Sequence, residues 1–389
     1  MTRYHHQILH SLSEISQDSW NACCFNEATH HNPFLSHQFL SALEDSGCAT
    51  ADTGWQARHI AICNADDDVV GVMPLYLKSH SYGEYVFDHA WANAYQNAGG
   101  RYYPKLQSAI PFTPVTGRRL AVRPGENIPE IQQEILKTAV SLATTLGVSS
   151  LHVTFTEQAE WDFMTKHGLL KRRDQQFHWI NQGYRSFEDF LQALSSRKRK
   201  NIRKERRQAV AHDIEVEVVT GRQITEAHWD DYFTFYQDTG QRKWGRPYLN
   251  RLFFSLLGER LSDRIVLIMA RRGGRYIAGA LNLVSDDTLY GRYWGAIEDH
   301  RYLHFEICYY QAIDYAIRHG LKRVEAGAQG EHKLARGYLP TSTYSAHWIR
   351  NPAFKEAVAD YLRQERAAVR QDQAFLSGFA PFKKDGAAK

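Results

Sequence analysis

The sequence lacks the marks of a secreted, membrane-spanning or disulfide-bonded protein. Five cysteines are spread along the chain without a Cys-x-x-Cys pair, and their odd number argues against a disulfide framework. The longest apolar run of the second half, residues 265–270, is far shorter than the roughly 20 residues that cross a bilayer. Residues 1–7, MTRYHHQ, contain no apolar core of a signal peptide. We therefore expect a cytoplasmic protein without a transmembrane segment.

Motifs for metal or nucleotide chemistry are also missing. The 19 histidines include no His-Glu-x-x-His pattern, and the adjacent pairs His5–His6 and His30–His31 have no nearby cysteine ligands. The phosphate-binding pattern Gly-x-x-x-x-Gly-Lys-Ser/Thr is absent. The sequence therefore predicts no metal site, no P-loop ATPase activity and no tightly bound cofactor.

The composition is that of a globular protein with uneven charge. The chain has 389 residues, 43% of them hydrophobic and 23% charged, which favours two domains. Residues 197–207 contain eight basic side chains and one acidic one, so the rest of the chain has a net charge of −3 against a total of +4. Such a block indicates a phosphate-bearing partner, although a solvated helix face has the same composition.

The chain carries an internal repeat. Residues 15–20, ISQDSW, resemble residues 224–229, ITEAHW, at an offset of 209. Residues 69–75, VVGVMPL, resemble residues 277–283, IAGALNL, at an offset of 208. Two similarities at nearly the same offset predict that one fold was duplicated.

Each half has the pattern of an antiparallel meander followed by a helix and one more strand. Short alternating runs separated by Gly and Asp turns predict the meanders, and apolar residues at helical spacing predict the helices, which stop at Gly147 and Gly320. The predicted strands are 58–63, 69–78, 151–155, 264–270, 276–284, 289–294 and 321–325.

These patterns set the expected domain boundaries. We expect an N-terminal domain over residues 1–180, a basic linker helix over 181–213 and a C-terminal domain over 214–389. The first domain holds an aromatic, proline-containing insertion at about 89–119, which we expect to help wall the site. The linker helix begins after the N-cap Ser186 and continues through the basic block, and an amphipathic helix follows residue 351.

Three segments resemble a known family: residues 195–204, residues 292–296 with 303–311, and residues 324–338, VEAGAQGEHKLARGY. They are similar to tandem acyltransferases of the GNAT superfamily, in particular to the FemAB-like predicted N-acyltransferases. The resemblance implies an α/β (α+β) fold with two tandem GNAT-like domains, each a mixed, mostly antiparallel sheet flanked by helices. Residues 294–304 lack the Arg/Gln-x-x-Gly-x-Gly/Ala loop with which many GNAT enzymes bind coenzyme A.

N-acyl transfer needs a base for the amine proton, donors for the oxyanion and a binding region for donor phosphates. The glycine-rich turn after the last predicted strand offers Glu331 or His332 as the base and Lys333 as an anion or carbonyl binder, and Glu306 is the second candidate base. The further candidates for substrate binding are Arg336, Tyr344, His304, Trp91, Tyr95 and Tyr103, and those for donor binding are Arg199, Arg203, Gly327 and Gly330.

Three functions fit these features. The first is an N-acyltransferase that moves an acyl group from acyl-CoA to an amine. The second is a Fem-type transferase that uses aminoacyl-tRNA and a peptidoglycan precursor, as the basic block favours. The third is a non-catalytic module that binds a cell-wall fragment or an anionic membrane surface. None of the three involves DNA.

Overall fold

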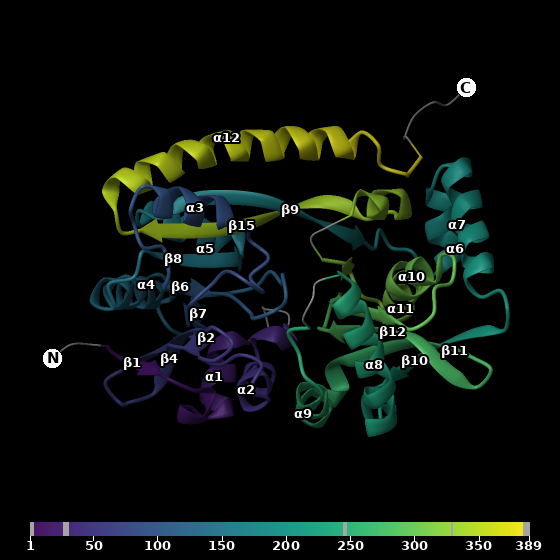
Figure 1. Cartoon of the computed structure of the whole chain (residues 1–389), viewed down its shortest axis with the longest axis horizontal. Helices are drawn as coiled ribbons and strands as arrows, with labels where there is room; N and C mark the ends of the chain where they lie inside the picture. Colours follow the sequence, from purple (N-terminus) through teal and green to yellow (C-terminus); the bar gives the residue numbers. More distant parts are fainter. Residues whose placement is uncertain (1–3, 26–30, 244–246, 328–329, 384–389) are drawn as a thin grey trace. The chain divides into compact units, whose positions relative to one another are not determined.

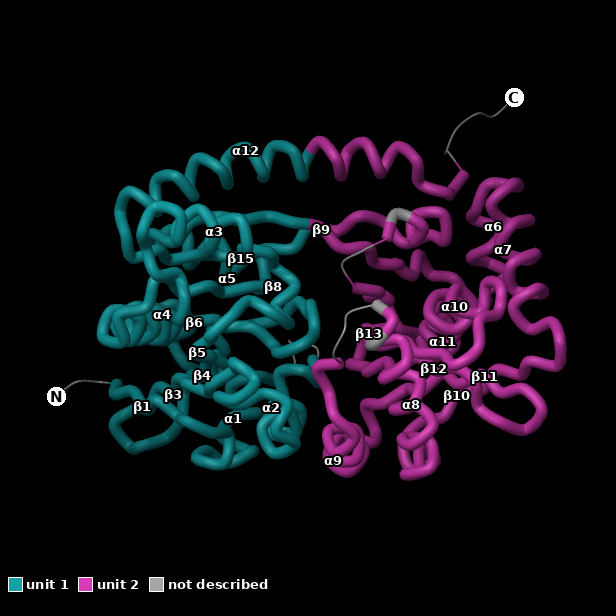
Figure 2. Tube along the Cα trace, in the orientation of Figure 1, with its two compact units in different colours: residues 1–174, 342–370 teal, residues 175–341, 371–389 magenta. Residues whose placement is uncertain are grey.

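The computed structural model describes residues 4–25, 31–243, 247–327 and 330–383. The chain forms two compact units, which are treated one at a time below. Unit 1 comprises residues 1–174 and 342–370, and unit 2 comprises residues 175–341 and 371–389 (Figure 2). No helix among the described residues is long and apolar enough to cross a membrane.

Unit 1 contains two sheets. The first has the strand order β1-β3-β4-β7 and the second contains β15-β8-β6-β5-β2 (Figure 1). Pairing is antiparallel except between β6 and β8, which run parallel. The strands are β1 (His5–Leu9), β2 (Trp55–Ala57), β3 (His59–Cys63), β4 (Val69–Met73), β5 (Tyr76–Lys78), β6 (Lys105–Ser108), β7 (Ala121–Val122), β8 (Ser150–Thr156) and β15 (Leu339–Ile349).

Helix α4 closes the main core of unit 1. Its buried residues, among them Ile131, Ile135 and Ala139, recur at helical spacing and pack with residues of β3, β4 and β8. As the sequence predicts, the helix ends before Gly147, which has a φ of +67°. The helices of this unit are α1 (Gln17–Cys24), α2 (His37–Asp45), α3 (His89–Asn97), α4 (Ile128–Thr145) and α5 (Gln158–Lys166).

Two details of unit 1 differ from the prediction. The predicted strand 69–78 is broken at Pro74, which has no N–H for a sheet ladder, so β4 and β5 belong to different sheets. The predicted insertion is more than a covering loop, because it contains helix α3 and strand β6, the parallel partner of β8.

Unit 2 is built on the strand order β10-β11-β12-β13-β14-β9. Its strands β13 and β14 run parallel and are joined through the helical segment 303–318. That segment packs on the face of β12 that carries Ala278 and Ala280, whereas Tyr232 of helix α8 (Glu226–Lys243) lies against Gly279 on the other face. The strands are β9 (Leu170–Ile180), β10 (Ile214–Thr220), β11 (Ile265–Arg272), β12 (Arg275–Val284), β13 (Thr288–Ala296) and β14 (Arg323–Glu325).

The predicted linker helix is in fact two helices. Helix α6 (Phe187–Ala193) begins after Ser186, whose hydroxyl accepts a hydrogen bond from the backbone N–H of Asp189. The chain then becomes extended at Leu194, which forms a β-bridge with Phe382, and Ser195 N–H donates to the Pro381 carbonyl. These contacts interrupt the helix, so the basic block forms the separate helix α7 (Ser196–Ala209).

The other helices of unit 2 surround this sheet. Residues 303–318 are helical throughout, with a wider π turn at Glu306–Tyr310. The predicted amphipathic helix after residue 351 is present as α12. The bounds are α8 (Glu226–Lys243), α9 (Arg251–Leu261), α10 (Leu303–Phe305), α11 (Gln311–Arg318) and α12 (Pro352–Ser377).

The two units share a topology but exchange a strand. In each unit two parallel strands are connected through a helical segment: β6 and β8 in unit 1, and β13 and β14 in unit 2. The second strand of each pair has an antiparallel neighbour on its other side in the sheet. The antiparallel partner of β14 is β9, which comes earlier in the chain, and the partner of β8 is β15, which comes much later. Residues 342–370 therefore cluster with unit 1, although the sequence analysis assigned them to the C-terminal domain.

Candidate active site

The candidate site of unit 2 lies where β13 and β14 part. The two strands pair only over Thr288–Tyr290 and Arg323–Glu325, while β13 continues to Ala296. The pairing of β13 with β12 shifts at the same level, because Asn282 lies opposite Gly291 and Leu281 lies opposite Tyr293. Such a bulge bends a strand and redirects a side chain. The strands therefore leave an opening beside Gly291 that paired strands would close.

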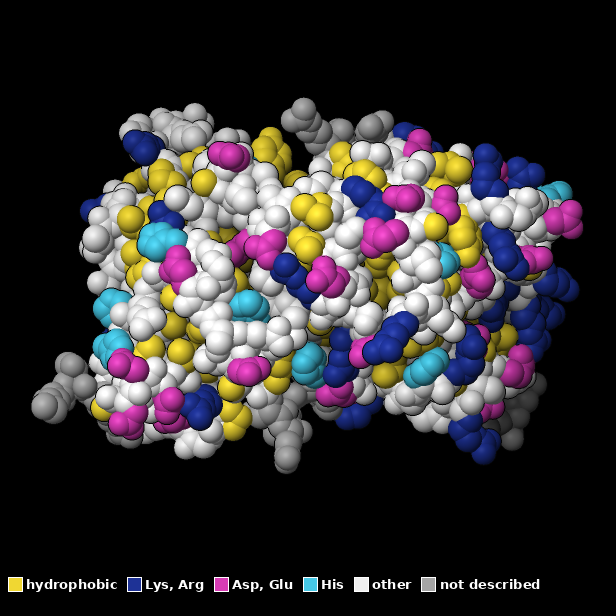
Figure 3. All heavy atoms as spheres, turned by 90° about the horizontal axis from the view of Figure 1, so that it is seen from below, with side chains coloured by type: hydrophobic (Ala, Val, Ile, Leu, Met, Phe, Trp, Pro, Cys, Tyr) yellow, Lys and Arg dark blue, Asp and Glu magenta, His cyan; other side chains and the backbone are white. Residues whose placement is uncertain are grey.

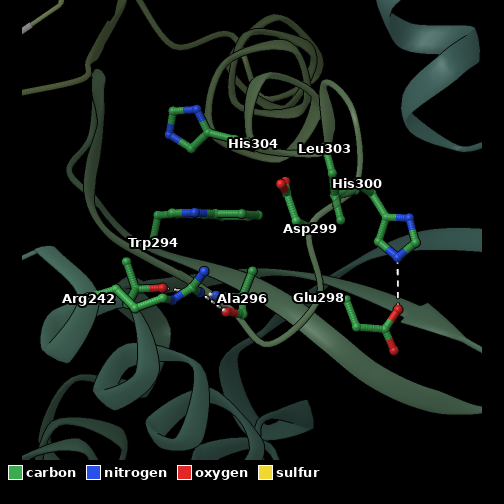
Figure 4. Close-up of a pocket in the computed structure, with 9 residues that line it drawn as sticks. Arg242, Trp294, Ala296, Glu298, Asp299, His300, Leu303 and His304 are labelled. Carbon is green, nitrogen blue, oxygen red and sulfur yellow. Dashed lines mark hydrogen bonds and ion pairs between the residues drawn. The ribbon is translucent and has the colours of Figure 1, made fainter.

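Two neighbouring cavities occupy this region, and Trp294 and His304 line both of them. The larger cavity, of about 270 Å³, is also lined by Thr239, Arg242, Ala296, Glu298, Asp299, His300 and Leu303 (Figure 4). The smaller cavity, of about 100 Å³, is also lined by Ala280, Asn282, Gly291, Arg292, Tyr293, Cys308, Tyr309 and Ala326.

The boundary between the cavities is aromatic. The ring centroids of His304 and Trp294 are 5.3 Å apart with an interplanar angle of 71°. Figure 4 shows His304 and Asp299 on one side of the Trp294 ring and Arg242 on the other. The carboxylate oxygens of Glu298 contact side-chain nitrogens of Arg272, Arg275 and His300 at 2.7 to 3.3 Å. The His304 side chain therefore lines both cavities beside the Trp294 ring.

Lys333 lies behind the small cavity. Its side chain is buried, and its Nζ donates hydrogen bonds to the carbonyls of Ala326 and, at 3.1 Å, Gly327. Burial lowers the pKa of Lys333 to about 8, with Arg292 adding to the effect and Cys308 opposing it. At neutral pH the ammonium thus carries its charge next to Ala326, which lines the cavity.

His332 is held by Tyr309, which lines the small cavity. The Tyr309 hydroxyl and His332 Nε2 are 2.9 Å apart. Desolvation, followed by the charges of Arg336 and Lys333, lowers the pKa of His332, while burial raises the pKa of Tyr309. A neutral imidazole and a neutral phenol therefore share this hydrogen bond. The turn requires Gly330, because a Cβ there would lie 2.4 Å from the His332 ring and its φ is +112°.

Glu306 and Arg336 are held in ion pairs. Arg206 of α7 donates to both carboxylate oxygens of the buried Glu306 at 2.9 to 3.2 Å, and Gln311 adds a third donor at 2.8 Å. Arg336 donates to Glu205 at 2.8 Å, and its guanidinium lies 3.5 Å from the ring centroid of Phe305. These pairs fasten helix α7 to the segments on which His304, His332 and Lys333 are carried.

The sequence-predicted site residues are divided between the units. Glu306, His304, His332, Lys333 and Arg336 come together in unit 2, and the side chain of Glu331 lies outside the described part of the structure. The remaining aromatic candidates belong to unit 1. Trp91, Tyr95 and Tyr103 pack in one cluster there, and Tyr344 packs with Trp161 elsewhere in that unit and donates to Gln158 at 3.0 Å.

The candidates for donor binding lie in three places. Arg199 is half-buried on α7 and donates to the Leu194 carbonyl at 3.4 Å, and Arg203 is exposed and ion-paired with Glu188. Gly327 has a φ of +75° and supplies one of the carbonyls that hold Lys333. Gly330, at the start of the next turn, makes room for the His332 ring.

Trp294 and Asn282 are cavity residues that the sequence analysis did not select. A signal for Asn282 was present, because it is the single polar residue in the run 277–283, IAGALNL. A buried amide in an apolar strand is costly unless it is hydrogen-bonded. Trp294 gave no such signal, since an aromatic residue in a strand is ordinary core material.

Comparison with known proteins places the chain in a family. Among proteins of curated function none matches. The structure is similar to that of FemX, with a TM-score of 0.54 and 12% identity over 91% of this chain and 100% of the other. It is also similar to L-PGS from Bacillus licheniformis, with a TM-score of 0.51 and 9% identity over 87% and 99%. At these identities the likeness shows the fold. The model of the FemAB-like family, described as peptidoglycan biosynthesis/recognition, matches residues 11–384, and the chain belongs to this family.

Proposed function

We propose that unit 2 carries the active site of an acyl or aminoacyl transferase that modifies an amine of a peptidoglycan precursor. The observation that carries this proposal is the pair of cavities that meet at Trp294 and His304 beside the parted strands. Membership of a family described by peptidoglycan biosynthesis/recognition supports the choice of acceptor. Two adjoining cavities suit a reaction that brings two substrates together.

The residues at the junction divide the chemistry between them. The donor carbonyl occupies the small cavity, beside which Lys333 supplies positive charge to the oxyanion that forms on attack, while the charge of Arg292 is offset by its buried ion pair with Glu325 at 3.2 Å. The amine enters from the larger cavity, and His304 removes its proton directly or through one water. The protonated His304 then returns this proton to the leaving oxygen or sulfur of the donor. The Tyr309 hydroxyl, which is 2.9 Å from His332 Nε2, forms part of the wall of the small cavity. Glu306, paired with Arg206, is a positioning residue and not the base.

His304→Ala is expected to lower kcat/KM for transfer by about a hundredfold, because general base catalysis contributes on that scale or more. The rate is measured as the release of the deacylated carrier, free CoA or uncharged tRNA, in the presence of pooled amines. The matched control is His319→Ala, since His319 is exposed and stacks on Tyr315 outside both cavities. Equal losses in the two variants contradict the role of His304, and binding without turnover in the unmodified protein favours a non-catalytic module.

The donor we favour is an aminoacyl-tRNA, and helix α7 supplies the reason. Arg197, Lys200, Lys204 and Arg207 are exposed and spaced so that they share one face, called here the basic face of α7. The described residues contain no ion-pair partner for any of the four. Over the view in Figure 3, lysine and arginine side chains are denser on unit 2 than on unit 1. An acyl-CoA is the second candidate, because it offers a similar activated carbonyl. It ranks second because it has far fewer phosphates for the basic face of α7 to bind.

The double variant Lys204→Gln/Arg207→Gln tests the donor. If the basic face of α7 binds RNA phosphates, the slope of log Kd against log salt should fall by about 1.5, because each neutralised phosphate contributes roughly 0.7 to 0.9. Filter binding of charged tRNA between 50 and 200 mM salt, on the order of the range that resolves such slopes, measures it. Arg222→Gln/Lys322→Gln is the control, since both residues are exposed elsewhere on unit 2. An unchanged slope with intact acyl-CoA binding would favour the thioester.

A further inference from the structure

Asn282 has a fixed orientation in the wall of the small cavity. The residue is 1% exposed, and its Nδ2 donates hydrogen bonds to the carbonyls of Val266 at 3.1 Å and Ala280 at 3.2 Å. Only the nitrogen of an amide can donate, so these two contacts determine which side-chain atom is the oxygen. Oδ1 is therefore the atom that remains for another partner, and it accepts no hydrogen bond from any residue that the structure describes.

The glycine opposite Asn282 leaves this oxygen accessible. A Cβ built on Gly291 would lie 3.3 Å from Oδ1, and Gly291 and Asn282 both line the small cavity. A side chain at position 291 would cover the oxygen. Because Asn282 lines the cavity, Oδ1 can accept a hydrogen bond from a group bound there. An Asn placed here for stability alone would have both ends of its amide satisfied, so the open oxygen points to a ligand.

The surroundings define the ligand group. A cavity of about 100 Å³ holds only a small group. Arg292 lines it and is paired with the buried Glu325 at 3.2 Å, so among the described residues the charge of Lys333 behind the cavity is the uncompensated one, and an amine bound there is favoured in its neutral form. A neutral amide oxygen suits such a group, because it accepts one N–H and leaves the nitrogen lone pair free, whereas a carboxylate would favour the ammonium ion.

We propose that Asn282 is the specificity-determining residue of the small cavity, and that its Oδ1 accepts an N–H of the group transferred there. The site then selects a small acyl group that carries an amino group over the same group without the nitrogen. This inference rests on the proposed function for its effect on turnover, but the binding preference that it predicts can be measured without turnover.

The test compares two small esters, glycine methyl ester and methyl acetate, which differ only in the amino group. Their Kd values are measured by ligand-observed NMR on the full chain. The unmodified protein is expected to prefer glycine methyl ester by about tenfold, the value of one hydrogen bond of about 1.4 kcal/mol. Asn282→Leu should bind both esters equally. Gly291→Ala, which keeps Asn282 and only covers Oδ1, should reduce the preference and serves as the second variant if Asn282→Leu does not fold.

The outcomes separate this inference from the proposed function. Equal Kd values for the two esters in the unmodified protein overturn the role of Asn282, and so does a preference that persists in both variants. A general loosening of the sheet would weaken both esters together and leave their ratio unchanged. If the protein shows a preference that depends on Asn282 but no transfer activity, the inference is supported and the proposed transferase function is contradicted. If the protein shows transfer activity but no preference between the esters, the proposed function is supported and the inference is contradicted.

Discussion

Lys333→Met is expected to lower kcat/KM for transfer by about 10² to 10³, because removing one donor or charge at a developing oxyanion has effects of that size. The ammonium is held by the carbonyls of Ala326 and Gly327, so its charge is fixed next to the cavity before the substrate arrives. Lys322→Met is the matched control, since Lys322 is exposed and 4.0 Å from its partner Asp287.

The pH dependence gives a second readout for Lys333. With a pKa of about 8, its charge is complete well below pH 8 and is lost as the pH rises through that value, so activity should decline over the same range. Lys333→Arg keeps its charge and should move this decline to higher pH, although the planar guanidinium fits the two carbonyls less well. A steady-state rate profile between pH 6 and pH 10, on the order of two units either side of that pKa, measures the shift. An alkaline limb that is identical in the arginine variant contradicts the assignment.

Lys105→Met is expected to destabilise unit 1 by about 3 to 5 kcal/mol, because it leaves buried carboxylates without their cation. Lys105 is fully buried, and its Nζ contacts Glu84 Oε2 at 2.7 Å, Ser81 Oγ at 2.8 Å and the carboxylate of Asp88. Burial alone would lower the pKa of Lys105, but Glu84 and Asp88 raise it. This cluster fastens β6, which is part of the aromatic insertion, to residues 81–88 before it.

Hydrogen exchange of the β6 and β8 backbone amides measures the loss of stability in unit 1 independently of unit 2. Burial raises the pKa of Glu84 to about 7, so in the variant this carboxyl can be neutralised by protonation as the pH falls. The difference between Lys105→Met and the unmodified protein should therefore be smaller at pH 5 than at pH 8. Lys137→Met is the control, because Lys137 is 60% exposed in its pair with Glu134 and should change stability by less than about 0.5 kcal/mol. A loss no larger than in this control contradicts the role of Lys105.

Local patterns in the sequence predicted most of the elements but not their partners. The helices before Gly147 and Gly320 and the hairpin of β11 and β12 follow from residue spacing and turn residues. The exchange of β9 and β15 does not, since each strand has the same alternation whichever neighbour it joins. The break between α6 and α7 also escaped prediction, because it depends on contacts with Pro381 and Phe382, far along the chain.

The candidate site was predicted in part for the same reason. The glycine-rich turn drew attention to His332 and Lys333, and the polar face of a predicted amphipathic helix drew attention to His304 and Glu306. That Glu306 is paired with Arg206 could not be read from the sequence, since the two residues are 100 positions apart.

The sequence by itself determined the family pattern, the duplicated fold and the residue types available for acyl transfer, because these depend on periodicity and on short motifs. Only the tertiary structure decided which of those residues share a cavity, how Lys333 is charged and which atom of Asn282 faces a ligand. Burial, strand register and the partners of a charge depend on residues that meet only when the chain has folded.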